Sequence, residues 1–175
     1  MKNFLETERL VVKLTDPSHF DDILALRADP EVQKYTMQEV YTKENVEKFL
    51  KIIIPYQEKH GHAMSSVFTK EDGAFIGQAG IFHIGHYDLQ PEIEIGYRFH
   101  KIYWGNGYAT EVSKALINWG FENLSLNEII AFVETSNKAS HRVVEKCAMH
   151  NLGLVQCHYG KLEKYVITRK EWELL

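Results

Sequence analysis

The chain has 175 residues, of which 45% are hydrophobic and 25% charged, a balance typical of a globular protein. This length suits one domain with a sizeable core, so we expect residues 1–175 to form a single domain. The net charge of -4 gives no global reason to expect nucleic acid or an anionic membrane as a partner. The first nine residues lack the apolar run of a signal peptide, and no stretch of about 18 apolar residues follows. We therefore expect a cytoplasmic protein.

The front part of the chain predicts one strand and two helices. Residues 10–14 form an apolar strand, after which Asp16 and Pro17 provide a cap and a first helical residue. Thr42 caps the second helix, which Pro55 either ends or kinks. The apolar stripes are Phe20, Ile23 and Leu24 in the first helix, and Val46, Phe49, Leu50 and Ile53 in the second.

From residue 62 the hydrophobic period changes to two, which predicts strands. The pattern gives a hairpin of strands 63–69 and 74–84, a strand at 93–99, a helix at 107–122 and a strand at 128–134. Asn137 caps a helix at 138–147, and strands at 152–158 and 164–168 close the chain. This order predicts a mixed α/β (α+β) fold with about seven strands, mostly antiparallel, and a parallel pair where helix 107–122 crosses over.

A short glycine turn lies between strand 93–99 and helix 107–122. Gly105 and Gly107 allow a tight bend, and the first turn of the helix offers unpaired N–H donors and the positive end of its dipole. The turn therefore predicts an anion site. A dinucleotide fingerprint is excluded because Thr110 stands at the third glycine position, and no Gly-Lys-Ser/Thr run follows that would indicate a nucleotide triphosphate loop.

Four motifs in order resemble the GNAT superfamily of acyl-CoA-dependent N-acetyltransferases, in the branch of the Rim-type ribosomal-protein N-terminal acetyltransferases. They are Thr7-Glu8-Arg9-Leu10, Glu94-Ile95-Gly96-Tyr97, Trp104-Gly105-Asn106-Gly107-Tyr108-Ala109-Thr110-Glu111 and Asn137-Lys138-Ala139-Ser140. The resemblance implies a GNAT-like fold with helices on both faces of the sheet. It also implies acetyl-CoA as co-substrate, with no metal.

The resemblance places the superfamily's pyrophosphate motif on residues 104–109, where Trp104 replaces the usual Gln or Arg. Backbone N–H groups do most of the anion binding in such a turn, so we expect it to function despite the replacement. If strand 93–99 splays from strand 128–134, as the resemblance implies, backbone groups of residues 97–99 bond the pantetheine arm. The cofactor-binding candidates are therefore Tyr97, Arg98, Phe99, Trp104, Gly105, Asn106, Gly107, Tyr108, Ala109, Thr110, Asn137 and Ser140.

Acyl transfer to an amine needs a neutral amine and stabilisation of the thioester oxygen. Glu94 is our candidate base, direct or through water, because strand alternation lets it face the cleft while Ile95 faces the core. Many superfamily members use a tyrosine seven residues after the motif asparagine as general acid, but that position is Val144. The open alternatives are Ser140, Tyr159 or unassisted departure of the thiolate. Ser140 is also a candidate for binding the pantetheine arm.

We expect the amine to attack the thioester directly in a ternary complex, without a covalent intermediate on Cys147. The alternative class is a non-catalytic acyl-CoA-binding module or sensor. Acceptors consistent with the resemblance are a protein N-terminus or a small amine, and a homodimer is plausible.

Histidine pairs without further ligands at metal spacing give no reason to expect a metal. The pairs are His60-x-His62 and His83-x-x-His86. His83, His86 and Tyr87 are instead placed where one of them could line the acceptor site.

Overall fold

The structure is a computed structural model that describes residues 3–36, 39–87 and 89–175. Within these residues eight strands form one sheet in the order β1-β2-β3-β4-β5-β6-β8-β7. The strands are β1 (Asn3–Glu6), β2 (Leu10–Lys13), β3 (Met64–Thr69), β4 (Phe75–His83), β5 (Ile93–Phe99), β6 (Glu128–Val133), β7 (His150–Cys157) and β8 (Gly160–Thr168). The pairs are antiparallel except β5 with β6, which are parallel because α4 crosses over between them.

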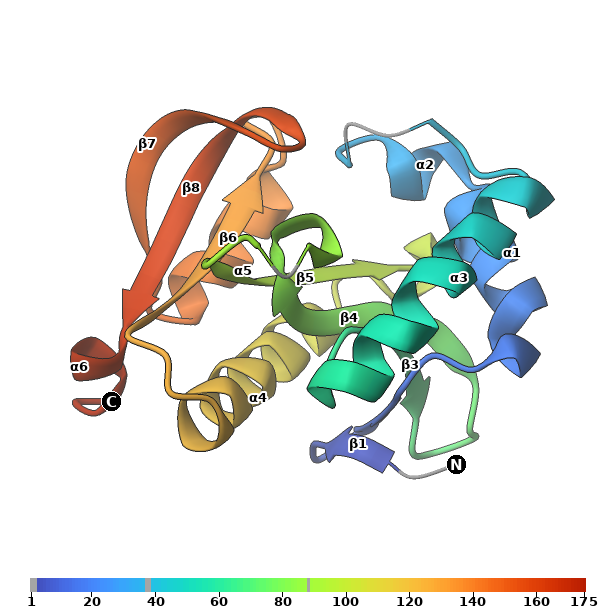
Figure 1. The fold of residues 1–175 in the computed structure, drawn as a ribbon, viewed down its shortest axis with the longest axis horizontal. Helices are drawn as coiled ribbons and strands as arrows, with labels where there is room; N and C mark the ends of the chain where they lie inside the picture. Colours follow the sequence, from blue (N-terminus) through green and yellow to red (C-terminus); the bar gives the residue numbers. More distant parts are fainter. Residues whose placement is uncertain (1–2, 37–38, 88) are drawn as a thin grey trace.

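Helices cover both faces of the sheet, as the resemblance implied (Figure 1). The helices are α1 (Phe20–Arg27), α2 (Pro30–Gln33), α3 (Lys43–His60), α4 (Tyr108–Asn123), α5 (Lys138–Lys146) and α6 (Arg169–Trp172). Helices α4 and α5 pack on one face, whereas α1 and α3 pack together on the other. None of the helices in the described ranges is long and apolar enough to cross a membrane.

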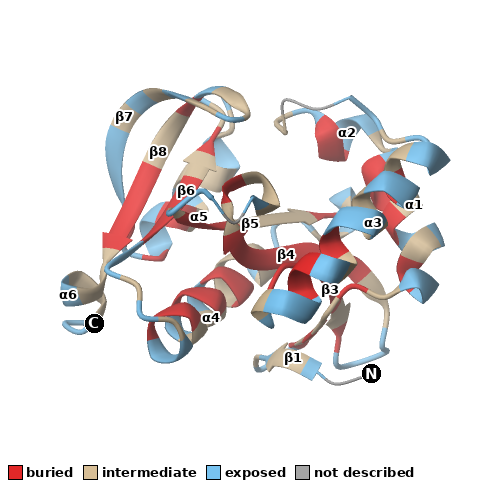
Figure 2. Cartoon of the chain, viewed as in Figure 1, coloured by how far each residue is buried: buried red, intermediate tan, exposed pale blue. Residues whose placement is uncertain are grey.

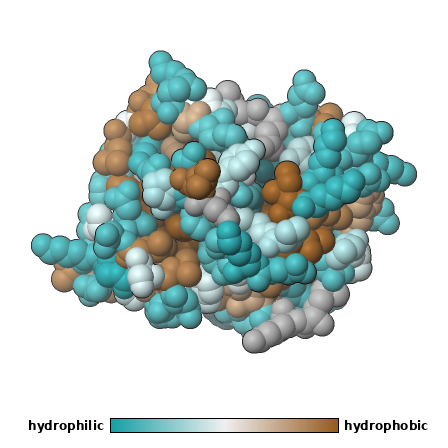
Figure 3. Space-filling model, viewed as in Figure 1, coloured by the Kyte–Doolittle hydropathy of each residue, from teal (hydrophilic) through white to brown (hydrophobic). Residues whose placement is uncertain are grey.

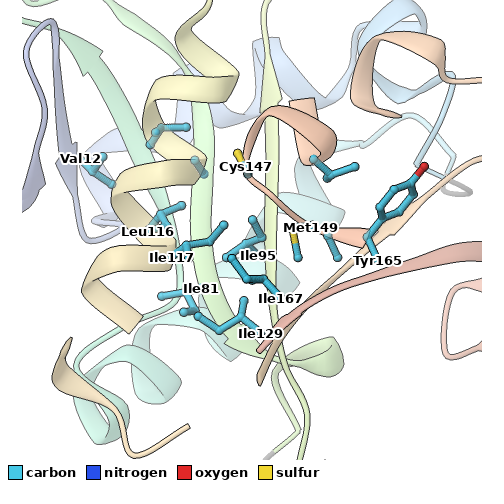
Figure 4. Packing of buried hydrophobic residues seen from close by; sticks show 14 of the residues in the cluster. Val12, Ile81, Ile95, Leu116, Ile117, Ile129, Cys147, Met149, Tyr165 and Ile167 are labelled. Atoms are coloured by element: carbon cyan, nitrogen blue, oxygen red, sulfur yellow. The ribbon is translucent and has the colours of Figure 1, made fainter. Parts of the chain in front are cut away.

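The main core lies between α4 and the middle of the sheet. Leu116 and Ile117 of α4 face Ile81, Ile95 and Ile129 of three strands (Figure 4), and all five are buried. Figure 2 shows the buried residues concentrated along β4 and the sheet-facing side of α4. This apolar contact fixes α4, and with it the turn that precedes it, against the end of β5.

The sheet divides where β5 meets β6. Their ladder contains a single pair, Glu94 with Ile130, although β5 pairs with β4 over its whole length. Beyond Glu94 the two strands diverge, which is the splay that the resemblance implied. Backbone groups of β5 and β6 that face the opening therefore lack the partners a continuous ladder would provide.

Three features differ from the sequence-based prediction, and one alternative that it left open is decided. Helix α3 does not end at Pro55 but continues through it to His60, because buried side chains beyond it keep the last turns packed. Strand β1 was not predicted, since four residues at a sheet edge carry little periodic signal. Helices α2 and α6 were also missed, because each spans a single turn.

Candidate active site

A cavity of about 1060 Å³ opens at the splay of β5 and β6. Its walls come from the turn before α4, from β5, β6 and α5, and from α1 and α3. In the space-filling view, hydrophobic side chains gather near the middle of the face, among hydrophilic ones (Figure 3). Two chemically different ends share this cavity: a glycine turn at a helix N-terminus and a buried carboxyl.

The first end is the turn at residues 104–110, where the sequence predicted an anion site. Gly105 and Gly107 have φ of 79° and 81°, the left-handed region that favours glycine. Gly107 stands at the N-cap of α4 without a side-chain cap, and the N–H of Glu111 is the first to bond back, to Gly107 O at 3.0 Å. The N–H groups of the first helical turn thus have no partner within the helix, a geometry that suits an anion.

The side chains of Trp104 and Asn106 hold the shape of this turn. The Trp104 indole N–H donates to the Phe99 carbonyl at 2.8 Å, and the Asn106 amide donates to the Tyr103 carbonyl at 3.1 Å. Trp104 therefore ties the turn to the end of β5, a contact that explains how the turn keeps its geometry without the usual Gln or Arg.

The buried carboxyl is Glu94 on β5, which is 4% exposed. The Tyr159 hydroxyl, from the turn between β7 and β8, donates to Glu94 and accepts from the Gly85 N–H at 3.1 Å. Burial raises the pKa of Glu94 to about 8, and the Tyr159 hydrogen bond opposes that rise. Glu94 can consequently gain or lose a proton near neutral pH.

On the opposite face of β5, Tyr97 meets α5. Its hydroxyl donates to Ser140 Oγ at 2.9 Å, and the Ser140 N–H donates to Asn137 Oδ1 at 3.2 Å, which confirms Asn137 as the helix cap. Because the Ser140 oxygen accepts from Tyr97, its own proton can be donated elsewhere. Val144 lies one turn further along α5 and is buried, so no phenol stands there.

The GNAT acetyltransferase domain family matches residues 9–150 of the chain. The chain belongs to the GNAT acetyltransferase family. The uncharacterized N-acetyltransferase p20 of Bacillus licheniformis is 31% identical over 98% of this chain and 95% of its own length. The uncharacterized protein YkkB of Bacillus subtilis is 37% identical, over 54% of each chain. A solved acetyltransferase from Agrobacterium tumefaciens has the same fold with a TM-score of 0.81, at 26% identity, covering 97% of this chain and 95% of that chain.

The remaining sequence candidates of this acetyltransferase fall on both sides of β5. Phe99 is buried in the main core and also lines the cavity. Tyr108, Ala109 and Thr110 form the first turn of α4 and line it too. Arg98 is a cofactor candidate through its backbone, whereas its side chain donates to Gln33 Oε1 of α2 at 2.8 Å. Its backbone stays on the splayed edge.

His83 and His86 were both considered for the acceptor site, and of the two only His86 lines the cavity. His86 stacks on Phe82 with ring centroids 4.3 Å apart, and burial lowers its pKa to about 3. His83 instead contacts the Tyr56 hydroxyl at 2.6 Å, and Tyr87 is exposed. His86 is therefore a neutral side chain of the wall.

Sequence reasoning overlooked two cations on α5, Arg142 and Lys146, which line the cavity. Their four-residue spacing puts them on one face of the helix, a signal present in the sequence. It also overlooked the contacts of Glu111, whose carboxylate accepts from Thr7 and from both the N–H and the guanidinium of Arg9. These contacts join two of the motifs that were read separately.

Cys147 is not an activated nucleophile. It is buried in the main core, and burial raises its pKa to about 11. A thiol with this pKa is almost entirely protonated at neutral pH, which disfavours a covalent intermediate.

Proposed function

We propose that this acetyltransferase moves the acetyl group of acetyl-CoA to a primary amine by direct attack of the amine on the thioester. The observation that carries the proposal is that one cavity contains both an uncapped helix N-terminus and the buried carboxyl of Glu94. The first suits a phosphate-bearing donor and the second suits proton transfer.

The donor end is assigned to residues 104–110, with the backbone N–H groups of the turn binding the pyrophosphate. Two observations support this assignment: the positive φ of Gly105 and Gly107, and the lack of a side-chain cap. Arg142 and Lys146 add positive charge on the same side of the cavity. Coenzyme A supplies the thioester, and the splayed edges of β5 and β6 offer backbone groups for the amides of its arm.

Glu94 is assigned as the base that accepts a proton from the acceptor amine, directly or through a water molecule. An ordinary glutamate is a weak base at neutral pH, whereas a pKa of about 8 is close to that of an α-amino group. The Tyr159 hydroxyl keeps the carboxyl in one orientation, since it donates to one of its oxygens.

Ser140, on the other face of β5, is assigned as the proton donor to the leaving sulfur. The Tyr97 hydroxyl donates to Ser140 Oγ, so the Ser140 proton is free to point toward the sulfur. Burial raises the pKa of Tyr97 to about 12, which keeps the phenol protonated as a donor to Ser140. This pair replaces the tyrosine that Val144 excludes.

The acceptor is a primary amine, either a protein N-terminus, as the Rim-type resemblance implies, or a small amine. The test measures thiol release from acetyl-CoA with a panel of peptide N-termini, amino acids and polyamines. Acceptor-dependent release supports the proposal. Tight binding of coenzyme A with no release for any acceptor would favour the non-catalytic binding module instead.

The assignment of Glu94 is tested by Glu94→Gln, which preserves size and removes the titration. We expect kcat/KM to fall and to lose one ionisation from its pH profile. Glu92→Gln is the comparison variant, because Glu92 precedes β5 by one residue and pairs with Lys164. It should keep the ionisation of Glu94 but move it to lower pH, since the charge of Glu92 helps to raise the pKa of Glu94. An unchanged profile in Glu94→Gln contradicts the assignment.

A further inference from the structure

Two arginines share the α1–α3 side of the cavity. Arg27, at the end of α1, is 3% exposed and lies with its guanidinium carbon 4.0 Å from the Phe49 ring centroid and 4.8 Å from that of Tyr41. Its Nε donates to Gln78 Oε1 at 2.7 Å and its Nη1 to the Tyr41 hydroxyl at 2.9 Å. The side chain is thus held rigidly with only neutral partners.

Arg98 reaches the same region from β5. Its Nη1 donates to Gln33 Oε1, while its Nε is buried without a hydrogen-bond partner among the described residues. A buried guanidinium N–H without an acceptor is costly and needs an explanation. Both arginines line the cavity, so an acceptor atom supplied by a ligand can reach them.

The positive charge of the two arginines is not neutralised by the protein. In the part of the chain that the structure describes, no ion pair involves Arg27 or Arg98. Burial, together with the proximity of Arg98, lowers the pKa of Arg27 to about 9. Like charges placed together out of water are unfavourable unless an anion joins them.

The other charged groups of the cavity do not remove this excess. Glu94 has its pKa raised to about 8 and is mostly neutral at pH 7. Glu39 and Lys48 are exposed at the rim and carry opposite charges. Glu134 is bonded to Ser136 after β6, on the other side of the splay.

The position of Arg98 relative to Glu94 determines how far apart the two interacting groups of a ligand would lie. The two residues are four apart on β5 and so share one face, with their Cα atoms roughly 13 Å apart. Between them lies Gly96, where a Cβ would meet Met64 Cε and the Phe82 ring at 3.4 Å. A small apolar floor therefore connects the carboxyl to the arginines, which are long enough to reach back along the strand.

We propose that the acceptor is a primary amine that carries its own anionic group, a carboxylate or a phosphate, which Arg98 and Arg27 bind while the amine lies beside Glu94. This inference rests on the proposed function and narrows its acceptor. A guanidinium binds either anion through two parallel hydrogen bonds, and the unpartnered Nε of Arg98 supplies one such donor. Polyamines lack the anion and would add positive charge to a positive site.

The experiment compares matched acceptors. An α-amino acid, a longer ω-amino acid and phosphoethanolamine are each assayed beside a partner without the anion: the two amino acid amides and ethanolamine. Spermidine is the cationic reference. We expect kcat/KM for at least one anionic acceptor to exceed that of its partner by about 30-fold or more. Whether the carboxylate or the phosphate pair responds identifies the anion.

Arg98→Gln links the preference to the site. We expect it to lower kcat/KM for the anionic acceptor to the level of its neutral partner, so that the preference between the two is lost. Calorimetric titration of the anionic acceptor into the enzyme with coenzyme A bound should show the same loss of affinity. Lys101→Gln, which removes an exposed cation paired with Glu31, is the control and should retain the preference.

Two results overturn the inference and leave the proposed function standing. The first is a kcat/KM for neutral or cationic amines that equals or exceeds that for every anionic acceptor. The second is a fall in kcat/KM of the same size for all acceptors in Arg98→Gln. If no amine of any class is acetylated, the proposed function and this inference fail together.

Discussion

The hydrogen bond from Tyr159 to Glu94 makes a testable prediction about the pH dependence of catalysis. This bond lowers the pKa of Glu94, against the rise caused by burial. A hydrogen bond to a charged group contributes about 1.5–3 kcal/mol, which corresponds to roughly one to two pKa units. Tyr159→Phe should therefore raise the pKa of Glu94 further above its value of about 8.

The expected effect on activity follows from the fraction of Glu94 that is ionised. At pH 7 a carboxyl with a pKa of 8 is about one-tenth ionised, and a further rise of one to two units lowers that fraction about 10- to 100-fold. We expect kcat/KM of Tyr159→Phe, relative to the wild type, to fall by this factor at pH 7 and to recover toward pH 10. Taking the ratio at each pH cancels the titration of the acceptor amine, which both enzymes share.

The control is Tyr165→Phe, which removes another hydroxyl, bonded to His141 and Asn151. Its ratio should not change with pH. A ratio for Tyr159→Phe that is also constant between pH 6 and 10 would refute the reasoning, since Tyr159 would then not act on the ionisation of Glu94. The variant also leaves the Gly85 N–H without this partner, a stability loss of about 1–3 kcal/mol that denaturation measures separately.

Three further predictions concern stability and donor binding. The folded chain keeps the Glu94 proton up to about pH 8, whereas an unfolded chain loses it near 4.5, so this contribution to stability is complete below pH 4.5 and is lost as pH rises through 8. In urea titrations, the free energy of unfolding of Glu94→Gln should rise relative to that of the wild type by about 3–5 kcal/mol between pH 4.5 and pH 9. Parallel curves of unfolding free energy against pH for the two proteins would contradict this. Gly107→Ala should cost about 1–2 kcal/mol, because alanine is strained at a φ of 81°, and should weaken coenzyme A binding in a calorimetric titration; equal affinity would remove the turn from the donor site. Glu111→Gln weakens the bonds from Thr7 and Arg9 and should lower Tm in differential scanning calorimetry, with unchanged Tm arguing against a structural role.

Much of the fold followed from local patterns. The residues of β5, the start of α4 and the Asn137 cap were predicted from strand alternation and capping residues, and the structure agrees. The sequence left open whether Pro55 ends or kinks α3, and the structure shows that the helix continues, because packing of the residues after it outweighs the lost backbone bond. Elements of a single turn or four residues carry too little periodicity to be found this way.

The site was predicted less completely, because its side chains meet through tertiary contacts. Tyr159 is 65 positions from Glu94, and Ser140 is 43 positions from Tyr97. Nothing in the sequence around Glu94 indicates either the phenol that contacts it or its raised pKa. Arg98 was predicted at the cofactor through its backbone, and that prediction says nothing of its side chain, to which alternation along β5 gives the same face as Glu94.

The divergence of β5 from β6 leaves two strand edges unpaired, and this links the stability of the sheet to ligand binding. A strand edge with unpaired backbone groups attracts other extended chains, and proteins commonly protect such edges with charges or bulges. Here the unpaired edges of β5 and β6 face each other inside the sheet, where an extended ligand can lie between them. A ligand arm with its own amides would complete the interrupted ladder as a substitute strand. The same hydrogen bonds would then bind the acyl donor and hold the two halves of the sheet together. Substitutions that let β5 pair further with β6 would therefore make the sheet more rigid and weaken donor binding.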